Sequence, residues 1–182
     1  MTLVTVAPPN PAEPLIRPAC EADLPEILAI YNEVIATSTA VYSLEPSSLQ
    51  ERATWFATRT GAGFPVLVAQ VDQGVAGFAS FGEFRGAWPA YRFSVEHSVH
   101  VRPDMRRRGL GTTLISALFP LAAALGKHVM IGGIDADNDV SLRMHSRLGF
   151  ERVAHLREVG RKFDRWLDLV LMQRFLGELT SR

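Results

Sequence analysis

Three consecutive arginines run directly into a Gly-Leu-Gly turn at residues 106–111, and an apolar helical pattern begins at once. The start of a helix presents free N–H groups and a partial positive charge, which together attract anions. Glycine lets a ligand approach this backbone closely, and arginine adds charge-assisted hydrogen bonds to phosphate oxygens. Residues 106–113 are therefore a candidate pyrophosphate site. A glycine pattern this short also occurs in solvated basic loops before an ordinary helix, so its context has to decide.

A strand-like segment, "FSVEHSVHV" at residues 93–101, lies immediately before this turn. Its alternation places successive side chains on opposite faces. One face carries Val95, His97, Val99 and Val101, and the other carries Ser94, Glu96, Ser98 and His100. Glu96 could act as a general base; the alternative is a glutamate on the solvent face of an edge strand. His97 shares the apolar face, where we expect a packed, hydrogen-bonded histidine rather than a catalyst.

The remaining pattern predicts a mixed α/β domain with one central sheet and helices packed on it. A hairpin is expected at residues 65–84, around Asp72-Gln73-Gly74, and Ser47 or Ser48 is expected to cap the second helix. Pro120 should kink or shorten the third helix, because it cannot donate a hydrogen bond to Ser116. The other predicted strands are 15–19, 93–101, 128–134, 150–158 and 166–174, and the helices are 21–36, 47–63, 110–125 and 139–149.

The composition of the chain argues against several classes of protein. The chain has 182 residues with 19 basic and 19 acidic side chains, and this balance argues against a general nucleic-acid binder. A single cysteine excludes an internal disulfide framework, and the His and acidic residues show no ligand-like spacing, so we expect no metal. No apolar run matches a membrane span or signal peptide, and we expect a cytoplasmic protein. Residues 1–14, with four prolines, are expected to be a flexible tail before a single domain at 15–178.

Two motifs together resemble a known enzyme family. Arg106-x-x-Gly109-x-Gly111 after a strand resembles the acetyl-CoA signature of the GNAT acetyltransferases, and "DNDVSLRMHSRLGF" resembles that family's Asn-x-x-Ser/Ala…Gly-Phe segment. The segments "VEHSVHV" and "GRKFDRWLDL" resemble its phosphinothricin/methionine sulfone N-acetyltransferase branch. The resemblance covers about residues 15–176. It implies the GNAT fold, a mixed central sheet splayed between strands 4 and 5 with helices on both faces.

The resemblance also implies acetyl-CoA as cosubstrate and assigns residues to it. The exposed backbone of the splayed strand would pair with the pantetheine arm, the arginine-glycine turn would hold the pyrophosphate, and the second motif would touch the far end of the arm. In that order, the residues are Val99, His100 and Val101; Arg106, Arg107, Arg108, Gly109, Leu110, Gly111, Thr112 and Thr113; and Asn138 and Ser141.

For the chemistry, the resemblance points to Glu96 as the base that deprotonates an amine. His145 stands where many GNAT enzymes place a tyrosine that protonates the departing thiolate; a packing or capping role for it is the alternative. No cysteine lies near these motifs, so we expect direct attack in a ternary complex rather than an acyl-cysteine intermediate.

A small zwitterionic substrate needs a cation for its carboxylate and a shaped pocket for its side chain. The candidates are Arg85, Trp88, Tyr91 and Arg92 before the catalytic strand, Glu96 and Ser98 on it, and Lys162, Phe163 and Trp166 near the end of the chain. The alternatives are a surface loop and an edge hairpin. The resemblance implies substrates such as methionine sulfone, methionine sulfoximine or phosphinothricin, and a homodimer in which the second subunit completes the pocket.

Other functions remain open. The same scaffold could acetylate a peptide or protein N-terminus, which would need an open groove rather than an aromatic loop over the site. A non-catalytic acyl-CoA-sensing module would bind the cosubstrate without chemistry, and Glu96→Gln would then change nothing measurable.

Overall fold

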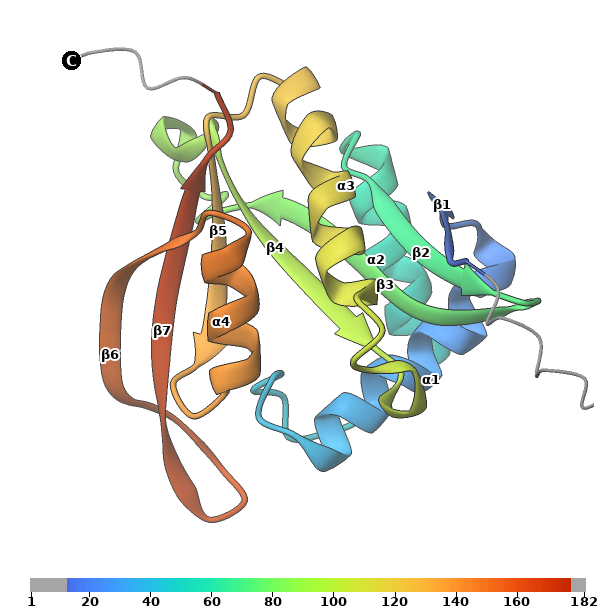
Figure 1. The fold of residues 1–182 in the computed structure, drawn as a ribbon, viewed down its shortest axis with the longest axis horizontal. Helices are drawn as coiled ribbons and strands as arrows, with labels where there is room; N and C mark the ends of the chain where they lie inside the picture. The colour runs from blue at the N-terminus through green and yellow to red at the C-terminus, as the bar shows by residue number, and fades with distance from the viewer. Residues whose placement is uncertain (1–12, 178–182) are drawn as a thin grey trace, which may run out of the picture.

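The computed structural model describes residues 13–177, and a seven-stranded sheet runs through its centre (Figure 1). The strands are β1 (Leu15–Pro18), β2 (Val66–Val71), β3 (Gly74–Glu83), β4 (Ser94–Val101), β5 (Val129–Asp135), β6 (Glu151–Lys162) and β7 (Arg165–Phe175). Their order in the sheet is β1-β2-β3-β4-β5-β7-β6. β4 and β5 pair in parallel, and the other neighbours pair antiparallel.

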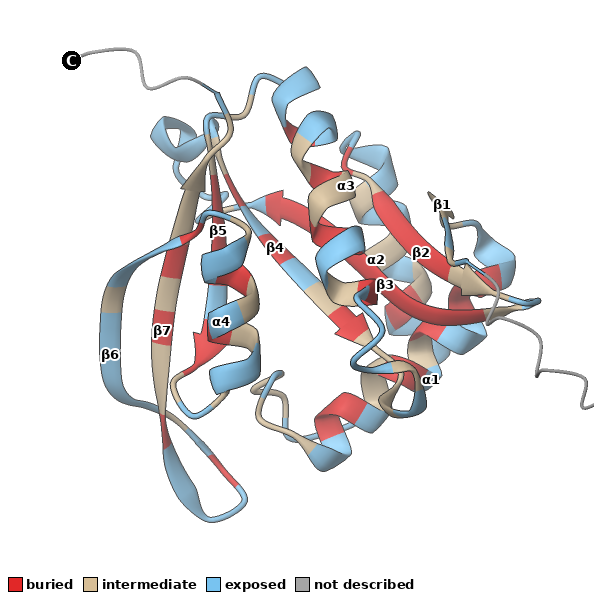
Figure 2. Ribbon diagram, in the orientation of Figure 1, coloured by how far each residue is buried: buried red, intermediate tan, exposed pale blue. Residues whose placement is uncertain are grey.

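Helices cover both faces of this sheet. They are α1 (Leu24–Thr37), α2 (Leu49–Gly61), α3 (Leu110–Ala124) and α4 (Asp139–Arg147), with 3₁₀ turns at Glu21–Asp23, Pro89–Tyr91 and Pro103–Met105. Alternation along β2 separates the two cores, since Leu67 and Ala69 pack with the α3 side and Val66 and Val68 with the α1 side. Burial concentrates on the central strands, whereas β6 is exposed along most of its length (Figure 2).

Local signals explain the element boundaries. Ser48, rather than Ser47, caps α2: its Oγ accepts from the Glu51 N–H at 3.2 Å, and its own N–H donates to the Glu51 carboxylate at 2.7 Å. The predicted hairpin is confirmed, and Asp72 in its turn has φ 55°. Pro120 does not shorten α3, which continues to Ala124.

The divergence of β4 from β5 positions the site. The two strands pair only at Ser94–Val129, Val95–Met130 and Glu96–Ile131. On its other side β4 pairs with β3 as far as Val101, opposite Gly77. The β4 backbone beyond Glu96 therefore has a free edge facing β5, and Figure 1 shows the two strands separating there. The predicted splay is confirmed.

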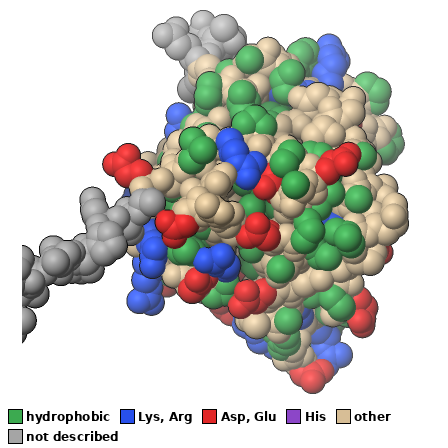
Figure 3. Space-filling model, turned by 90° about the vertical axis from the view of Figure 1, so that its right-hand side faces the viewer, with side chains coloured by type: hydrophobic (Ala, Val, Ile, Leu, Met, Phe, Trp, Pro, Cys, Tyr) green, Lys and Arg blue, Asp and Glu red, His purple; other side chains and the backbone are tan. Residues whose placement is uncertain are grey.

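The order of elements predicted from sequence is also confirmed, although β6 continues to Lys162 where a strand ending near residue 158 was expected. Apart from Glu13 and Pro14, the predicted tail lies outside the described residues. Within residues 13–177, none of the helices is both long and apolar enough to cross a membrane. On the face over β1, basic and acidic side chains are interspersed with apolar ones (Figure 3), in keeping with the zero net charge.

Candidate active site

The start of α3 has the geometry of an anion site. Gly109, at φ 79°, is the N-cap, and the first backbone hydrogen bond across this helix end runs from the Thr113 N–H to its carbonyl at 3.0 Å. The N–H groups of Leu110, Gly111 and Thr112 precede that bond and are therefore available to a ligand. The Leu110 side chain is buried and fixes the helix start in the core.

The turn leaves room for a bulky anion. A Cβ placed on Gly109 would meet no atom within 4 Å among the described residues, so the space beside it is open. Gly111 is different, since its Cβ would lie 3.1 Å from the Met144 sulfur, and glycine there lets α3 and α4 approach each other. The side chains of Arg106, Arg107 and Arg108 are exposed around the turn, and Arg106 Nε donates to the Val101 carbonyl at 3.3 Å.

The free edge of β4 runs from Glu96 toward this turn. Val99 and Val101 pack against the core under α3. His100, expected on the face of Glu96, is indeed on it but is buried, with its ring 5.6 Å from that of Tyr31 and 5.1 Å from that of Phe78. Burial lowers the pKa of His100 to about 4. Only its backbone can therefore face a ligand at the β4–β5 divergence.

The second motif forms the start of α4. Asn138 is the N-cap, and its Oδ1 accepts from the Ser141 N–H at 3.1 Å. This bond satisfies one of the free donors of α4 and fixes the Asn138 side chain beside the end of β5.

His145 faces away from solvent and contacts His97. Its Nδ1 lies 2.7 Å from the Ser141 carbonyl, which can only accept, so Nδ1 carries the proton. Its Nε2 then accepts from His97 Nε2 at 3.2 Å. Burial lowers the pKa of both rings, that of His97 to about 3. A neutral His145 in this tautomer has no proton on Nε2 to give to a thiolate, and the geometry favours the packing alternative.

Glu96 lies where β4 and β5 begin to part. Its Oε1 is 3.2 Å from the position that a Cβ on Gly133 of β5 would take, just past the last β4–β5 pair. The side chain keeps access to solvent. The surrounding protein nevertheless raises the pKa of this carboxyl by desolvation, against the opposing charge of Arg59. A carboxylate with a raised pKa is a better proton acceptor than an ordinary surface glutamate. Ser98, two residues on, is exposed on the same face.

The loop between β3 and β4 carries the predicted aromatic and basic residues. Tyr91 packs edge-on against Phe84 at 5.7 Å, and the Arg85 guanidinium lies about 6 Å from the Tyr91 ring. Arg92 lies over the Phe93 ring at 4.3 Å, and Trp88 is exposed. The loop thus forms a shallow aromatic pocket beside the start of β4, and its two arginines rest on aromatic faces.

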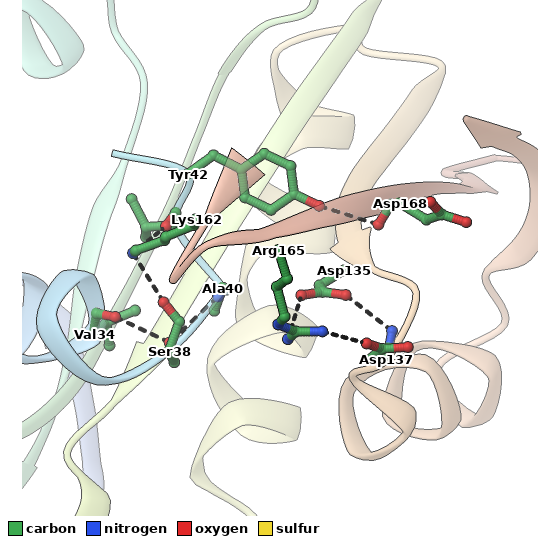
Figure 4. A network of polar contacts seen from close by, with 10 residues as sticks. Val34, Ser38, Ala40, Tyr42, Asp135, Asp137, Lys162, Arg165 and Asp168 are labelled. Carbon is green, nitrogen blue, oxygen red and sulfur yellow. Dashed lines mark hydrogen bonds and ion pairs between the residues drawn. The ribbon is translucent and has the colours of Figure 1, made fainter. Parts of the chain in front are cut away.

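Lys162 does not present a free cation. It is 4% exposed, and its ammonium donates to the carbonyls of Ser38 at 2.9 Å and Val41 at 2.8 Å (Figure 4). The Tyr42 hydroxyl in the same loop donates to the Asp168 carbonyl at 3.0 Å. These bonds fasten the α1–α2 loop to the β6–β7 hairpin, as the edge-hairpin alternative expects.

The tip of that hairpin exposes two aromatic side chains. Phe163 and Trp166 are 55% and 60% exposed. Large aromatic side chains exposed together are typical of contact surfaces.

Arg59 also lies close to Glu96, although the sequence patterns do not indicate it. This residue lies on α2, and its positive charge lowers the pKa of Glu96 from the same face of the sheet. In the sequence it is one polar residue among others on a helix, and no local pattern distinguishes it. Only the packing of α2 on the sheet brings it to the site.

Residues 27–150 match the family model described as "Acetyltransferase (GNAT) family". The chain belongs to the GNAT acetyltransferase family. Over 167 residues it is 48% identical to an L-methionine sulfoximine/L-methionine sulfone acetyltransferase of Pseudomonas aeruginosa, covering 91% of this chain and 96% of the relative. A phosphinothricin N-acetyltransferase of Streptomyces coelicolor is 36% identical, with 91% and 98% covered.

A solved structure extends the comparison to the fold. A GNAT superfamily phosphinothricin acetyltransferase from Sinorhizobium meliloti, in complex with acetyl-CoA, superposes with a TM-score of 0.88 at 39% identity, covering 92% of this chain and 90% of the other. This GNAT protein is therefore an acetyl-transferring enzyme with the fold that its motifs predict.

The GNAT site can accommodate acetyl-CoA. Open space beside Gly109, free amides on Leu110 to Thr112, exposed arginines and an unpaired β4 edge together match a diphosphate joined to a long polar arm.

If the diphosphate of acetyl-CoA binds beside Gly109, a negative charge at residue 109 should lower the affinity for acetyl-CoA. Gly109→Glu should weaken acetyl-CoA binding by at least about 10-fold, because a carboxylate would occupy the phosphate position. Gly109→Ala is the matched control: it introduces the same strain at φ 79° without the charge. Calorimetric titration of both variants with CoA measures the difference. Equal affinity of the two variants would show that the diphosphate binds elsewhere.

Proposed function

We propose that this enzyme transfers an acetyl group from acetyl-CoA to the primary amine of a small amino-acid-like substrate of the methionine sulfone, methionine sulfoximine or phosphinothricin type. The observation that carries the proposal is the position of Glu96: a carboxylate with a raised pKa lies at the mouth of the β4–β5 divergence. The acetyltransferases named above support the class of acceptor, since their own acceptors are small amino-acid analogues.

When bound, acetyl-CoA supplies the acetyl group as a thioester, which is activated toward an amine. The chain's own residues orient it: the turn at residues 106–111 binds the diphosphate through amides and guanidinium groups, and the free edge of β4 at Val99–Val101 pairs with the pantetheine arm. Backbone N–H groups on that edge can donate to the acetyl oxygen as it gains negative charge.

Glu96 takes a proton from the ammonium form of the substrate, directly or through a water molecule, so that the amine can attack. Direct attack is the simpler route here, because the single cysteine, Cys20, lies just before the 3₁₀ turn Glu21–Asp23, next to β1, and not at the β4–β5 divergence. His145 could protonate the leaving thiolate only after gaining a second proton, since its neutral form donates its one proton to Ser141.

The loop between β3 and β4 and the face of β4 that carries Glu96 select the substrate. Trp88, Tyr91 and Arg92 line the shallow pocket beside the start of β4, and the Arg85 guanidinium lies 6.0 Å from the Tyr91 ring. The exposed aromatic tip of the β6–β7 hairpin, Phe163 and Trp166, supports a homodimer in which this hairpin lies against a second subunit. We place the reaction in the cytoplasm, in keeping with an exposed free cysteine.

A thiol-release assay tests the proposal. The panel contains methionine sulfone, methionine sulfoximine, phosphinothricin, the standard amino acids and a peptide with a free N-terminus, each with acetyl-CoA. We expect CoA release to be fastest with the amino-acid analogues. Release only with the peptide would replace the proposal with N-terminal acetylation. Tight acetyl-CoA binding without turnover on any amine would instead support a sensing module.

A further inference from the structure

Arg59 occupies a space that a missing side chain leaves beside the catalytic strand. Its Nη1 lies 1.0 Å from the position that a Cβ on Gly82 would take. Gly82 pairs directly with Glu96 in the β3–β4 ladder, so a side chain at either position projects from the same face of the sheet. Glycine at residue 82 therefore allows a guanidinium from α2 to reach the neighbourhood of the Glu96 carboxylate.

The Arg59 guanidinium has no partner within residues 13–177. Arg59 is partly buried, yet its side chain makes no hydrogen bond there and no ion pair within 4.0 Å, not even with Glu96. Burial lowers its pKa, and the charge of Glu96 opposes that change. None of its side-chain nitrogen atoms is among the fully buried, unpaired atoms of the described residues, so its five N–H donors are available to a ligand.

The other arginines near the site lie against aromatic rings. The buried Arg52 guanidinium is 3.7 Å from the centroid of the Tyr31 ring and 4.8 Å from that of the Trp55 ring. Arg85 and Arg92 rest on aromatic rings of their own loop, and Arg92 also donates to the Pro89 carbonyl at 3.4 Å. Arg59 thus combines a position on the face of Glu96 with a guanidinium that, within residues 13–177, is neither hydrogen-bonded nor placed over an aromatic ring.

We propose that Arg59 binds the α-carboxylate of the amino-acid substrate while Glu96 receives the proton of its α-amine. An α-amino acid carries its cation and anion on one carbon atom, and the site offers an anion and a cation on one face that do not touch each other. The planar guanidinium fork suits a carboxylate, which it can bind through two parallel hydrogen bonds. This inference rests on the proposed function and names the determinant of its substrate class.

A substrate pair isolates the contact. Methionine sulfone and its carboxamide share the amine and the side chain and differ in the carboxylate charge. For Arg59→Met we expect kcat/KM to fall about 30-fold with the acid, within the range of a charged hydrogen bond, and less than about twofold with the carboxamide. Arg59→Lys should retain part of the activity on the acid. Arg147→Met, an exposed arginine at the end of α4, is the control and should match the wild type on both substrates.

A second variant moves Arg59 without removing it. Gly82→Ala places a Cβ where Nη1 lies, and the flexible guanidinium can swing away at little cost to the fold. We expect the same selective loss on the acid, with unchanged acetyl-CoA affinity and melting temperature.

Two results would overturn the inference. An equal loss on acid and carboxamide, with a shifted acid limb in the pH profile, would show that Arg59 acts only on the ionisation of Glu96. Wild-type activity of Arg59→Met on the acid would show that another cation binds the carboxylate. Both results leave the proposed function standing, because that function fails only if the wild-type enzyme acetylates no amino acid in the panel.

Discussion

Replacing Glu96 with glutamine should lower kcat by about 10²–10⁴-fold, the usual contribution of a positioned general base. Glutamine keeps the shape of the side chain and its place at the β4–β5 divergence but cannot accept a proton from an ammonium group. The thiol-release assay with methionine sulfone measures the loss. Acetyl-CoA affinity, measured by calorimetry, should stay within about twofold of the wild type, because the diphosphate turn lies at the far end of β4.

The pH profile gives the same prediction a second readout. Desolvation raises the pKa of Glu96 above its ordinary value of 4.5. The protonated carboxyl cannot act as a base, so wild-type activity should fall as the pH drops through this raised pKa. Glu96→Gln should have no such limb, whereas Glu151→Gln, an exposed glutamate on β6, should behave as the wild type. A glutamine variant with more than half of wild-type activity would place the base elsewhere.

Sequence reasoning succeeded where local pattern determines structure. The period-two alternation of residues 93–101 gives the faces of β4, since Val95 and His97 are buried on one side and Glu96 and Ser98 are exposed on the other. The cap at Ser48 and the turn at Asp72 each depend on residues at most four positions apart in the sequence. The anion turn before α3 is likewise local.

The contacts that could not be predicted from sequence join residues far apart in the chain. His97 and His145 are 48 residues apart, and Arg59 reaches Glu96 only because α2 packs over β3 at a glycine. Alternation puts His100 beside Glu96, but a helix covers that end of the strand and buries the ring against Tyr31. Lys162 was selected as a substrate ligand because of its charge, and its two carbonyl partners belong to a loop more than 120 positions away. Such pairings depend on how helices lie on the sheet, which no single window of sequence specifies.

The buried histidines predict a large loss of stability in mild acid. Burial lowers the pKa of His97 to about 3 and that of His100 to about 4, from an ordinary value of 6.5. The folded state then binds fewer protons than the unfolded chain. Their stabilising contribution is complete above pH 6.5 and is lost progressively as the pH falls toward the folded-state values. His145 of α4 lies near His97, and Arg52 of α2 lies near His100. Both neighbours lower the pKa of the ring beside them, and no acidic group acts on either ring to favour its protonated form.

Between pH 7.5 and 5.5 the free energy of unfolding should therefore fall by about 3 kcal/mol from His97 and His100 together, with His145 acting in the same direction. Urea denaturation at the two pH values measures this. The His100 ring makes no hydrogen bond with the described residues, so His100→Phe should keep the packing and remove about half of the pH dependence. His128→Gln, at an exposed histidine, should leave it unchanged. Equal stability of the wild type at both pH values would mean that these rings accept protons within the fold, and their depressed pKa values would then be refuted.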